Sequence, residues 1–215
     1  MYKLFFLFNC VACCVPLLAA EQRLYENNFE NAEVGKLPAD FLVLDGGFTI
    51  KDEAGNKVLE LPGAPLDSFA VQFGPAENFS VGASARIRGS AKGRRAPTFG
   101  LGLYGIAGYK LQVSPSKKTL ELFKDQDLKG TASYEWMPEH WTYLRLEVLN
   151  TGEHQWKIRG KAWSQGQAEP DAWTISAEAT QDPNSGRASV FGSPFSGTPI
   201  QFDDLVVYQI GTGKP

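Results

Sequence analysis

Two glutamates, Glu121 and Glu147, have side chains and positions that suit acid–base chemistry. Each alternates with apolar residues along its own segment, so each is predicted to point outward from a β-strand. If the two strands share a face, one carboxyl group donates a proton to a leaving group while the other acts as the base. On this hypothesis, replacing either residue with glutamine abolishes turnover and leaves binding nearly intact.

Side chains suited to sugar binding occupy outward positions of several other segments. Sugars are bound by aromatic rings that stack on C–H surfaces and by a few placed polar groups that pair with hydroxyls. A curved sheet would gather such residues on one face. The alternative is that each is a solvated strand residue that forms cross-strand ion pairs. The predicted ligand-binding residues are Arg86, Tyr104, Gln112, Arg145 and Trp163.

The remaining tryptophans of the chain divide by their position. Trp141 and Trp156 alternate with apolar residues and are predicted to lie in the core, whereas Trp136 and Trp173 adjoin loops and suit stacking on a ligand. The two histidines lie in different segments without zinc-binding spacing. No Gly-x-Ser-x-Gly motif is present, so neither zinc chemistry nor a serine nucleophile is expected.

The first twenty residues have the pattern of a secretory signal peptide. Lys3 precedes an apolar run from Leu4 to Leu18, and Ala19 and Ala20 supply the small side chains that signal peptidase requires. The run is shorter than the roughly 20 residues that span a bilayer. We therefore expect cleavage near Ala20 and a secreted or periplasmic protein with no membrane span after cleavage.

Cysteine usage and net charge narrow the range of partners. All three cysteines, Cys10, Cys13 and Cys14, lie within the signal segment, so the mature chain is expected to lack disulfides and thiolate ligands. A lipid anchor at Cys13 is the alternative to a freely exported chain. Without Lys3 the net charge of −3 becomes −4, which argues against nucleic acid or an anionic membrane as the main partner. The sequence carries no signal for an oligomeric state.

Short runs of alternating apolar and polar residues fill the rest of the chain. In one run Leu144, Leu146 and Val148 are predicted to face a core, while Arg145 and Glu147 face the opposite way. Leu146→Ala is therefore expected to cost far more stability than Glu147→Ala. Turn-forming residues separate the runs, and none has a helical period. The pattern predicts an all-β fold, an antiparallel two-sheet β-sandwich.

We expect a single β-sandwich domain over residues 21–210, followed by a loose tail at 211–215. Neither an internal repeat nor a linker interrupts the chain. The alternation and the turn signals together set the strand boundaries. Strands are predicted at about 41–44, 48–51, 57–61, 68–73, 79–88, 98–104, 109–113, 119–124, 143–148, 154–163, 173–179, 187–191 and 200–210.

Seven segments, read in order, resemble the concanavalin A-like lectin and glucanase superfamily, which includes laminin G-like domains and family-sixteen-type glycoside hydrolases. Together they span nearly all of the chain after residue 20. The resemblance implies a jelly-roll β-sandwich, in agreement with the alternation. The segments are YENNFE (25–30), GKLP (35–38), FSVGASARI (79–87), FGLGLY (99–104), GYKLQV (108–113), HWTYLRLEV (140–148) and IQFDDLVVYQ (200–209).

The resemblance leaves several functions open, because the superfamily includes lectins, glycosidases, adhesion modules and structural domains. Its retaining glucanases carry a Glu-x-Asp-x-x-Glu motif with two carboxylates about 5 Å apart, and this sequence lacks the motif. We therefore expect an exported carbohydrate- or surface-binding module without catalytic activity. One alternative is a glycoside hydrolase of the 3-keto-glycoside type, whose Gly-Tyr-x-Leu-Gln and Trp-x-x-x-Arg pieces occur at 108–112 and 141–145. The other is a structural or protein-interaction domain.

The resemblance also implies a structural calcium ion. Related proteins often bind it with an acidic residue near the amino end and an aspartate of the final strand, and Glu30, Asp203 and Asp204 match these places. Carboxylate oxygens suit the ion, which would tie the two ends of the chain together and raise the melting temperature. The alternative is that Asp203 and Asp204 cap an edge strand or pair with an arginine.

Overall fold

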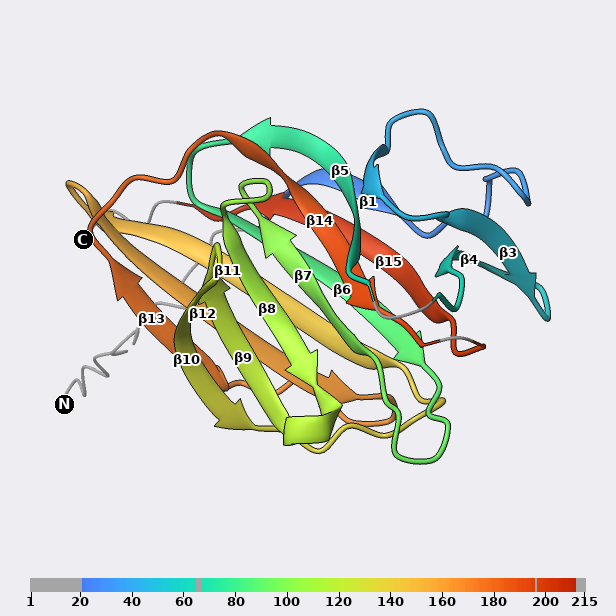
Figure 1. Cartoon of the computed structure of the whole chain (residues 1–215). Coiled ribbons are helices and arrows are strands. Elements are labelled where there is room, and N and C mark those ends of the chain that lie inside the picture. Colours follow the sequence, from blue (N-terminus) through green and yellow to red (C-terminus); the bar gives the residue numbers. More distant parts are fainter. Residues whose placement is uncertain (1–20, 65–66, 196, 212–215) are drawn as a thin grey trace, which may run out of the picture.

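Two antiparallel β-sheets pack face to face in the computed structural model, which describes residues 21–64, 67–195 and 197–211 (Figure 1). The predicted all-β sandwich is confirmed. The predicted signal peptide at 1–20 and residues 212–215 of the predicted tail lie outside the described residues.

The larger sheet, sheet A, has eight strands. Seven follow the order β13-β12-β11-β6-β15-β4-β3, and β1 pairs with β15 beside this path. Its strands are β1 (Gln22–Asn27), β3 (Thr49–Glu53), β4 (Asn56–Leu61), β6 (Val81–Gly89), β11 (Thr142–Gly152), β12 (Gln155–Ser164), β13 (Ile175–Ala179) and β15 (Ile200–Gln209).

The smaller sheet, sheet B, has seven strands in the order β10-β9-β8-β7-β14-β5-β2. A single 3₁₀ turn, η1 (Pro115–Lys117), joins β8 to β9. The strands of sheet B are β2 (Leu42–Asp45), β5 (Phe69–Glu77), β7 (Thr98–Leu103), β8 (Tyr109–Ser114), β9 (Thr119–Lys124), β10 (Asp127–Ser133) and β14 (Gly186–Ser193).

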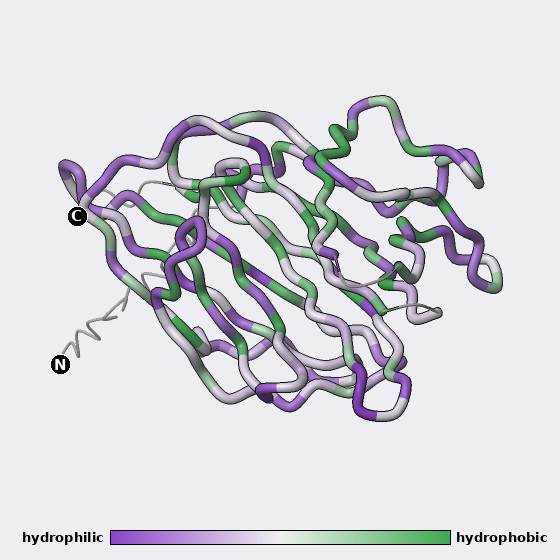
Figure 2. The backbone as a smooth tube through the Cα atoms, viewed as in Figure 1, coloured by the Kyte–Doolittle hydropathy of each residue, from purple (hydrophilic) through white to green (hydrophobic). Residues whose placement is uncertain are grey.

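Hydrophobic side chains from both sheets meet in one core. Leu144, Leu146 and Val148 of β11 are fully buried there, as the alternation predicted. A Cβ atom at Gly160 of sheet A would lie 2.5 Å from the side chain of Leu111 of sheet B, so the two sheets touch at this point. Figure 2 shows the same alternation of hydrophobic and hydrophilic residues along the strands. Polar side chains are consequently directed to the two outer faces.

Strands β1 and β10 were not predicted. Both have few apolar residues, and most of their residues are exposed or half-buried, so neither shows the alternation that identifies a half-buried strand. Main-chain pairing holds them instead, β1 against β15 and β10 against β9. Over the described ranges, no helix has the length and apolar character needed to cross a membrane.

Candidate functional site

Glu147 lies at the centre of the outer face of sheet A and is 2% exposed. Its carboxylate accepts hydrogen bonds from Arg145 at 3.0 Å, Arg159 at 2.8 Å and the Tyr208 hydroxyl at 2.8 Å. Gly82 of the intervening strand admits the tyrosine, because a Cβ atom there would lie 2.3 Å from the ring. Burial, reinforced by the Glu147 carboxylate, raises the pKa of Tyr208. These partners leave the carboxylate no evident freedom to act on a substrate.

A loop folds over the cations of this face. Trp173 lies 4.3 Å from the Arg159 guanidinium and 4.7 Å from the Lys161 ammonium, measured to the ring centroid. Lys161 donates a hydrogen bond to the main-chain oxygen of Pro170 at 2.7 Å and pairs with Glu169 at 2.8 Å. The sequence predicted that Trp173 suits stacking on a ligand. In the structure its ring instead stacks on the protein's own cations.

The predicted ligand-binding residues Arg86, Arg145 and Trp163 all lie on this outer face, and all have intramolecular partners. Trp163 stacks on Tyr143 with ring centroids 5.4 Å apart. Arg145 pairs with three carboxylates, those of Glu21, Glu147 and Glu169. The cross-strand ion pairs of the predicted alternative are present on this face, but the paired groups are buried or half-buried rather than solvated.

Arg86 also contacts Trp141, and this contact corrects a prediction. The Arg86 and Arg88 guanidinium groups lie 4.7 Å and 4.9 Å from the centroid of the Trp141 ring. Trp141 is buried as expected, yet its ring lies with the outward-pointing arginines rather than in the hydrophobic core. Trp156 does belong to that core, and Trp136 packs against its edge at Phe99.

Tyr104 is not on an outer face, so its predicted outward position is wrong. The residue is 3% exposed, and its hydroxyl donates a hydrogen bond to the main-chain oxygen of Phe79 at 2.7 Å. Its backbone φ is +61°, in the left-handed region, because the chain turns immediately after β7. Alternation stops at such a residue, and the ring turns into the core. Burial raises the pKa of Tyr104 as a result.

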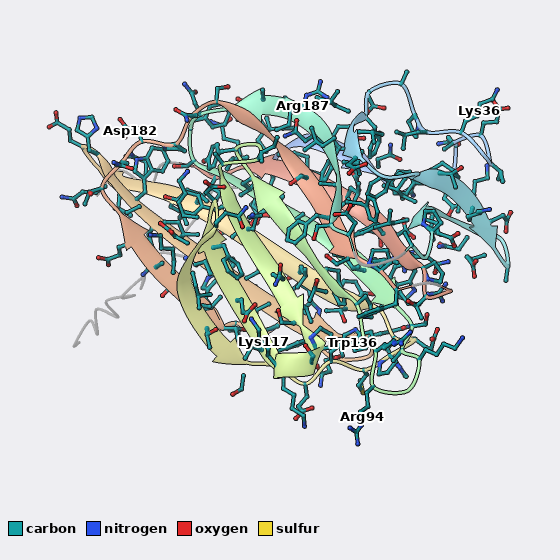
Figure 3. The ribbon with its side chains drawn as sticks, in the orientation of Figure 1. Lys36, Arg94, Lys117, Trp136, Asp182 and Arg187 are labelled. Atoms are coloured by element: carbon teal, nitrogen blue, oxygen red, sulfur yellow. The ribbon has the colours of Figure 1, made fainter. Side chains whose placement is uncertain are left out.

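Glu121 lies on β9 of sheet B, where its carboxylate accepts hydrogen bonds from Ser114 at 2.7 Å, Lys117 at 2.9 Å and Gln112 at 3.2 Å. Burial alone would raise the pKa of Glu121, but the bonds from Ser114 and Lys117 outweigh it and the pKa lies below its usual range. Figure 3 labels Lys117 at the η1 end of β8 and β9.

The predicted shared face for Glu121 and Glu147 is wrong. Glu121 points outward from sheet B and Glu147 outward from sheet A, with the core between the two sheets. Packed sheets lie about 10 Å apart, so these two carboxylates lie on opposite sides of the molecule. Alternation assigns a side of each strand but does not say to which sheet the strand belongs.

The predicted calcium ligands have other partners. Asp203 is fully buried and accepts a hydrogen bond from Arg86 at 2.5 Å, and Asp204 pairs with the same guanidinium at 3.0 Å. Glu30 accepts a hydrogen bond from the main-chain N–H of Lys57 at 3.1 Å. For the two aspartates, the predicted alternative to calcium, pairing with an arginine, is the arrangement present.

This donor set does not fit a calcium ion as it stands, because the Arg86 guanidinium already pairs with both Asp203 and Asp204. No group of three or more acidic, histidine or cysteine side chains is placed to hold a metal in residues 21–64, 67–195 and 197–211. Calcium at these residues stays a prediction, which melting curves with calcium and with a chelator test.

A groove crosses the outer face of sheet B near the β7–β8 turn. It has a volume of about 240 Å³, and Leu44 and Ile106 form exposed apolar parts of its wall. Two outward glycines of β7, Gly100 and Gly102, leave space beside the strand. The Phe191 ring of β14 covers Gly100, since a Cβ atom there would lie 2.4 Å from that ring.

Four polar side chains come to this groove from three strands. The register places Ser189 of β14 opposite Gly102, with Lys110 of β8 on one side and Gln72 of β5 on the other. Gln112 lies one row away, opposite Gly100. In the part of the chain that the structure describes, no protein group is hydrogen-bonded to the side chains of Gln72, Lys110 or Ser189. The groove therefore combines an aromatic ring with polar groups that have no protein partner.

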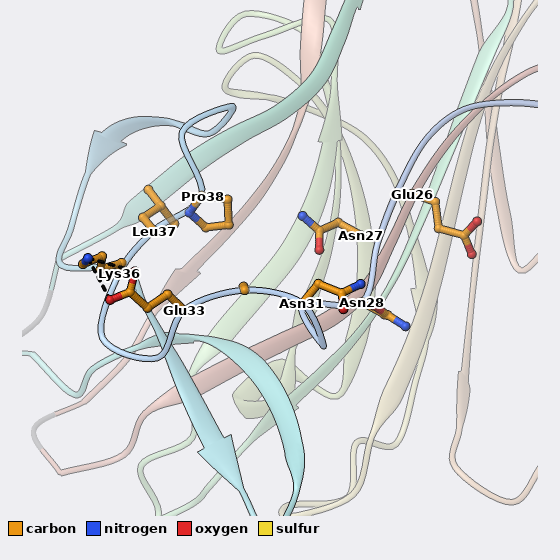
Figure 4. Close-up of a pocket in the computed structure, with 9 residues that line it drawn as sticks. Glu26, Asn27, Asn28, Asn31, Glu33, Lys36, Leu37 and Pro38 are labelled. Carbon is orange, nitrogen blue, oxygen red and sulfur yellow. Dashed lines mark hydrogen bonds and ion pairs between the residues drawn. The ribbon is translucent and has the colours of Figure 1, made fainter.

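A second, larger crevice lies along the loop after β1 and measures about 600 Å³ (Figure 4). Several of its polar side chains are engaged locally: Asn27 accepts a hydrogen bond from the Phe29 N–H at 2.8 Å, and Glu33 pairs with Lys36 at 2.7 Å. Its nine lining residues include no aromatic ring. The sheet B groove is therefore the better candidate for a binding site.

Alternation along β8 predicts the outward position of Gln112, but the other residues of this site were not predicted. The Gly-x-Gly pattern of β7 is a visible signal, because glycine in a strand often marks close approach of another group. Nothing in the sequence shows that β14 and β5 lie beside β7. Phe191, Ser189 and Gln72 become neighbours of Gly100 and Gly102 only through the sheet order.

No protein-family model matches the sequence, and a search of curated proteins gives no match. Solved structures share its fold. A carbohydrate-binding module, CBM66 from Bacillus subtilis, aligns with a TM-score of 0.54 at 12% identity, over 79% of this chain and 96% of that one. The Emp46p carbohydrate recognition domain aligns with a TM-score of 0.55 at 10% identity, over 86% and 95%.

A xylan β-1,4-xylosidase from Bacillus halodurans aligns with a TM-score of 0.59 at 16% identity. The match covers 93% of this chain but 42% of the xylosidase, so this chain spans less than half of that enzyme. At these identities the likenesses establish the fold. The chain is a jelly-roll β-sandwich of the kind found in carbohydrate-binding and lectin-like domains.

Proposed function

We propose that this protein is a carbohydrate-binding module whose binding site is the groove on the outer face of sheet B. The observation that carries the proposal is the set of polar side chains without protein partners, Gln72, Lys110 and Ser189, grouped beside the Phe191 ring. Sugar sites need such a combination, because a ring face packs against C–H groups while fixed donors and acceptors pair with hydroxyls. The similar folds of CBM66 and the Emp46p domain support the same reading.

Export and the absence of catalysis belong to this proposal. A signal peptide at 1–20 would place the module in the periplasm or outside the cell, where polysaccharides are accessible. Hydrolysis of a glycoside by two carboxylates requires them about 5 to 9.5 Å apart, and Glu121 and Glu147 belong to opposite faces of the sandwich. The glycosidase alternative therefore has no carboxylate pair among the residues suggested for it.

A glycan array followed by calorimetry on the hits tests the proposal. Phe191→Ala is expected to weaken binding of a hit about tenfold or more, because an anchoring ring contributes about 2 kcal/mol or more and about 1.4 kcal/mol corresponds to tenfold. Trp163→Ala is the matched control, since that aromatic residue lies on the outer face of sheet A. Loss of binding in the Trp163 variant with unchanged binding in the Phe191 variant would move the site to the other sheet.

A further inference from the structure

We infer that the sheet B groove takes a sugar that carries a carboxylate, and that the Lys110 ammonium binds that carboxylate. This inference rests on the proposed function and narrows it to acidic glycans, those containing uronic acid units. Lys110 is the single charged residue among the twelve that line the groove; the others are apolar, hydroxyl or amide side chains and one glycine. A ligand in the groove therefore meets one positive charge and no negative one.

The Lys110 side chain lies beside Gly102, which has no side chain of its own. A Cβ atom at Gly102 would lie 3.7 Å from Cγ of Lys110 and 2.5 Å from the Ser189 hydroxyl. The aliphatic part of Lys110 and the Ser189 hydroxyl therefore both lie next to the space that a side chain at Gly102 would fill. An ammonium bound to no protein acceptor is a ready partner for an anionic group.

The acidic side chain on the neighbouring strand of this face, Glu121, does not neutralise Lys110. Glu121 lies on β9, one strand beyond β8, and is paired with Lys117 at 2.9 Å. Ser114 and Gln112 supply its further hydrogen bonds. The carboxylate is 2% exposed and saturated, so the charge of Lys110 remains available to a ligand.

The groups around Lys110 suit the remaining atoms of a uronic acid. A carboxylate has two oxygens, and the Ser189 hydroxyl and the Gln72 amide N–H groups are donors for the oxygen that the ammonium leaves unpaired. The chain as a whole has a net charge of −3, so its general field repels an anion. Selectivity for an acidic sugar must therefore come from the local charge of Lys110.

Binding to matched pairs of oligosaccharides tests the inference. The pairs are tetragalacturonate and its methyl ester, tetramannuronate and its methyl ester, and a hyaluronan tetrasaccharide and its carboxyl-reduced form. We expect at least one acid to bind about tenfold tighter than its neutral partner, the effect of one hydrogen bond to a charged group. Added salt should weaken binding of the acid and leave that of the neutral partner unchanged.

Three variants test whether Lys110 causes the preference for the acidic oligosaccharide. Lys110→Met should remove the preference for the acid, and Lys110→Arg should retain most of it. Lys157→Met is the control, because it makes the same change in net charge at an exposed position of β12 in sheet A. Equal binding of acid and neutral partner, or an unchanged preference in Lys110→Met, would overturn the inference and leave the proposed function standing. Failure to bind any glycan of the array or panel would overturn both.

Discussion

Glu147 shows how a buried carboxylate can stabilise a sheet rather than act on a substrate. Two arginines and a tyrosine hydroxyl converge on it across three strands of sheet A. The sequence predicted its outward direction correctly, but not its burial. Glu147 is buried because the long side chains of Arg145, Arg159 and Tyr208 fold back over the strand and cover it. Alternation alone would leave an outward-pointing residue exposed.

Glu147→Ala is expected to lower the free energy of unfolding by about 3 kcal/mol, because two partly buried arginines and a tyrosine lose their partner. This corrects the expectation from alternation that the substitution costs little. Leu146→Ala, which leaves a cavity, is expected to cost about 2 to 5 kcal/mol. Urea unfolding of both variants checks the values, with exposed Lys157→Ala as the control. A loss below about 0.5 kcal/mol for Glu147→Ala would mean that the network contributes nothing to stability.

Glu121 is expected to make stability depend on pH. The pKa of Glu121 is lowered in the folded protein, so its contribution is fully present above the unfolded value of about 4.3 and is lost as pH falls through the folded pKa. Glu121→Gln should therefore be less stable than the parent by about 1 kcal/mol at pH 7. The difference should shrink below about pH 4.

Denaturant unfolding at pH 7 and at pH 3 measures this difference. Glu135→Gln is the control, because Glu135 forms an ion pair while 76% of its side chain is exposed. A constant difference between the parent and Glu121→Gln across that pH range would contradict the assignment of the pKa shift.

At the scale of elements, β7 shows both what the sequence predicts and where prediction stops. Its alternation places Phe99, Leu101 and Leu103 in the core, and all three are buried there. The outward positions hold Gly100 and Gly102, and their function depends on β14, which lies about ninety residues further along the chain. The alternation of apolar and polar residues within a strand predicts the direction of each side chain. The order of strands in a sheet depends on contacts between distant segments, so this alternation does not predict it.

Gly102→Val is expected to block the groove. The new side chain would take the space between the Ser189 hydroxyl and the Lys110 stem, so glycan binding should fall at least tenfold. Stability should change little, because valine favours strands and Ser189 is a small side chain that can rotate away. Thr98→Val on the same strand is the control, since Thr98 lies outside the groove. Calorimetry and thermal unfolding separate the two effects, and normal binding by Gly102→Val would contradict this location for the site.

At the scale of the whole molecule, the two outer faces differ in how their polar groups are used. Sheet A pairs its arginines and carboxylates with one another beneath the loop that carries Trp173. Among the described residues, sheet B leaves the side chains of Lys110, Gln72 and Ser189 without a hydrogen-bonded protein partner, at a groove on its outer face. The sequence predicted the sandwich, but it assigned residues of both faces to one site, because the assignment of strands to sheets depends on contacts between distant segments.

The mature protein is expected to begin at Glu21, because Ala20 fits the small-residue requirement of signal peptidase. Mass spectrometry of exported protein checks this, and material that retains residues 1–20 would contradict it. The new amino terminus would then adjoin the Glu21 carboxylate, which pairs with Arg145 on sheet A. Glu21→Gln should leave glycan binding unchanged, since that pair lies on the sheet opposite the groove.

The pairing of β1 with β15 sets Gln22 opposite Gln209, so both ends of the described fold leave the same sheet side by side. The groove opens from the other sheet. A tether attached at either end would therefore be joined to sheet A, whereas the groove lies on the outer face of sheet B. Immobilisation on a sensor surface through a terminal tag should preserve ligand capture, whereas random coupling through lysines would disable the molecules attached through Lys110.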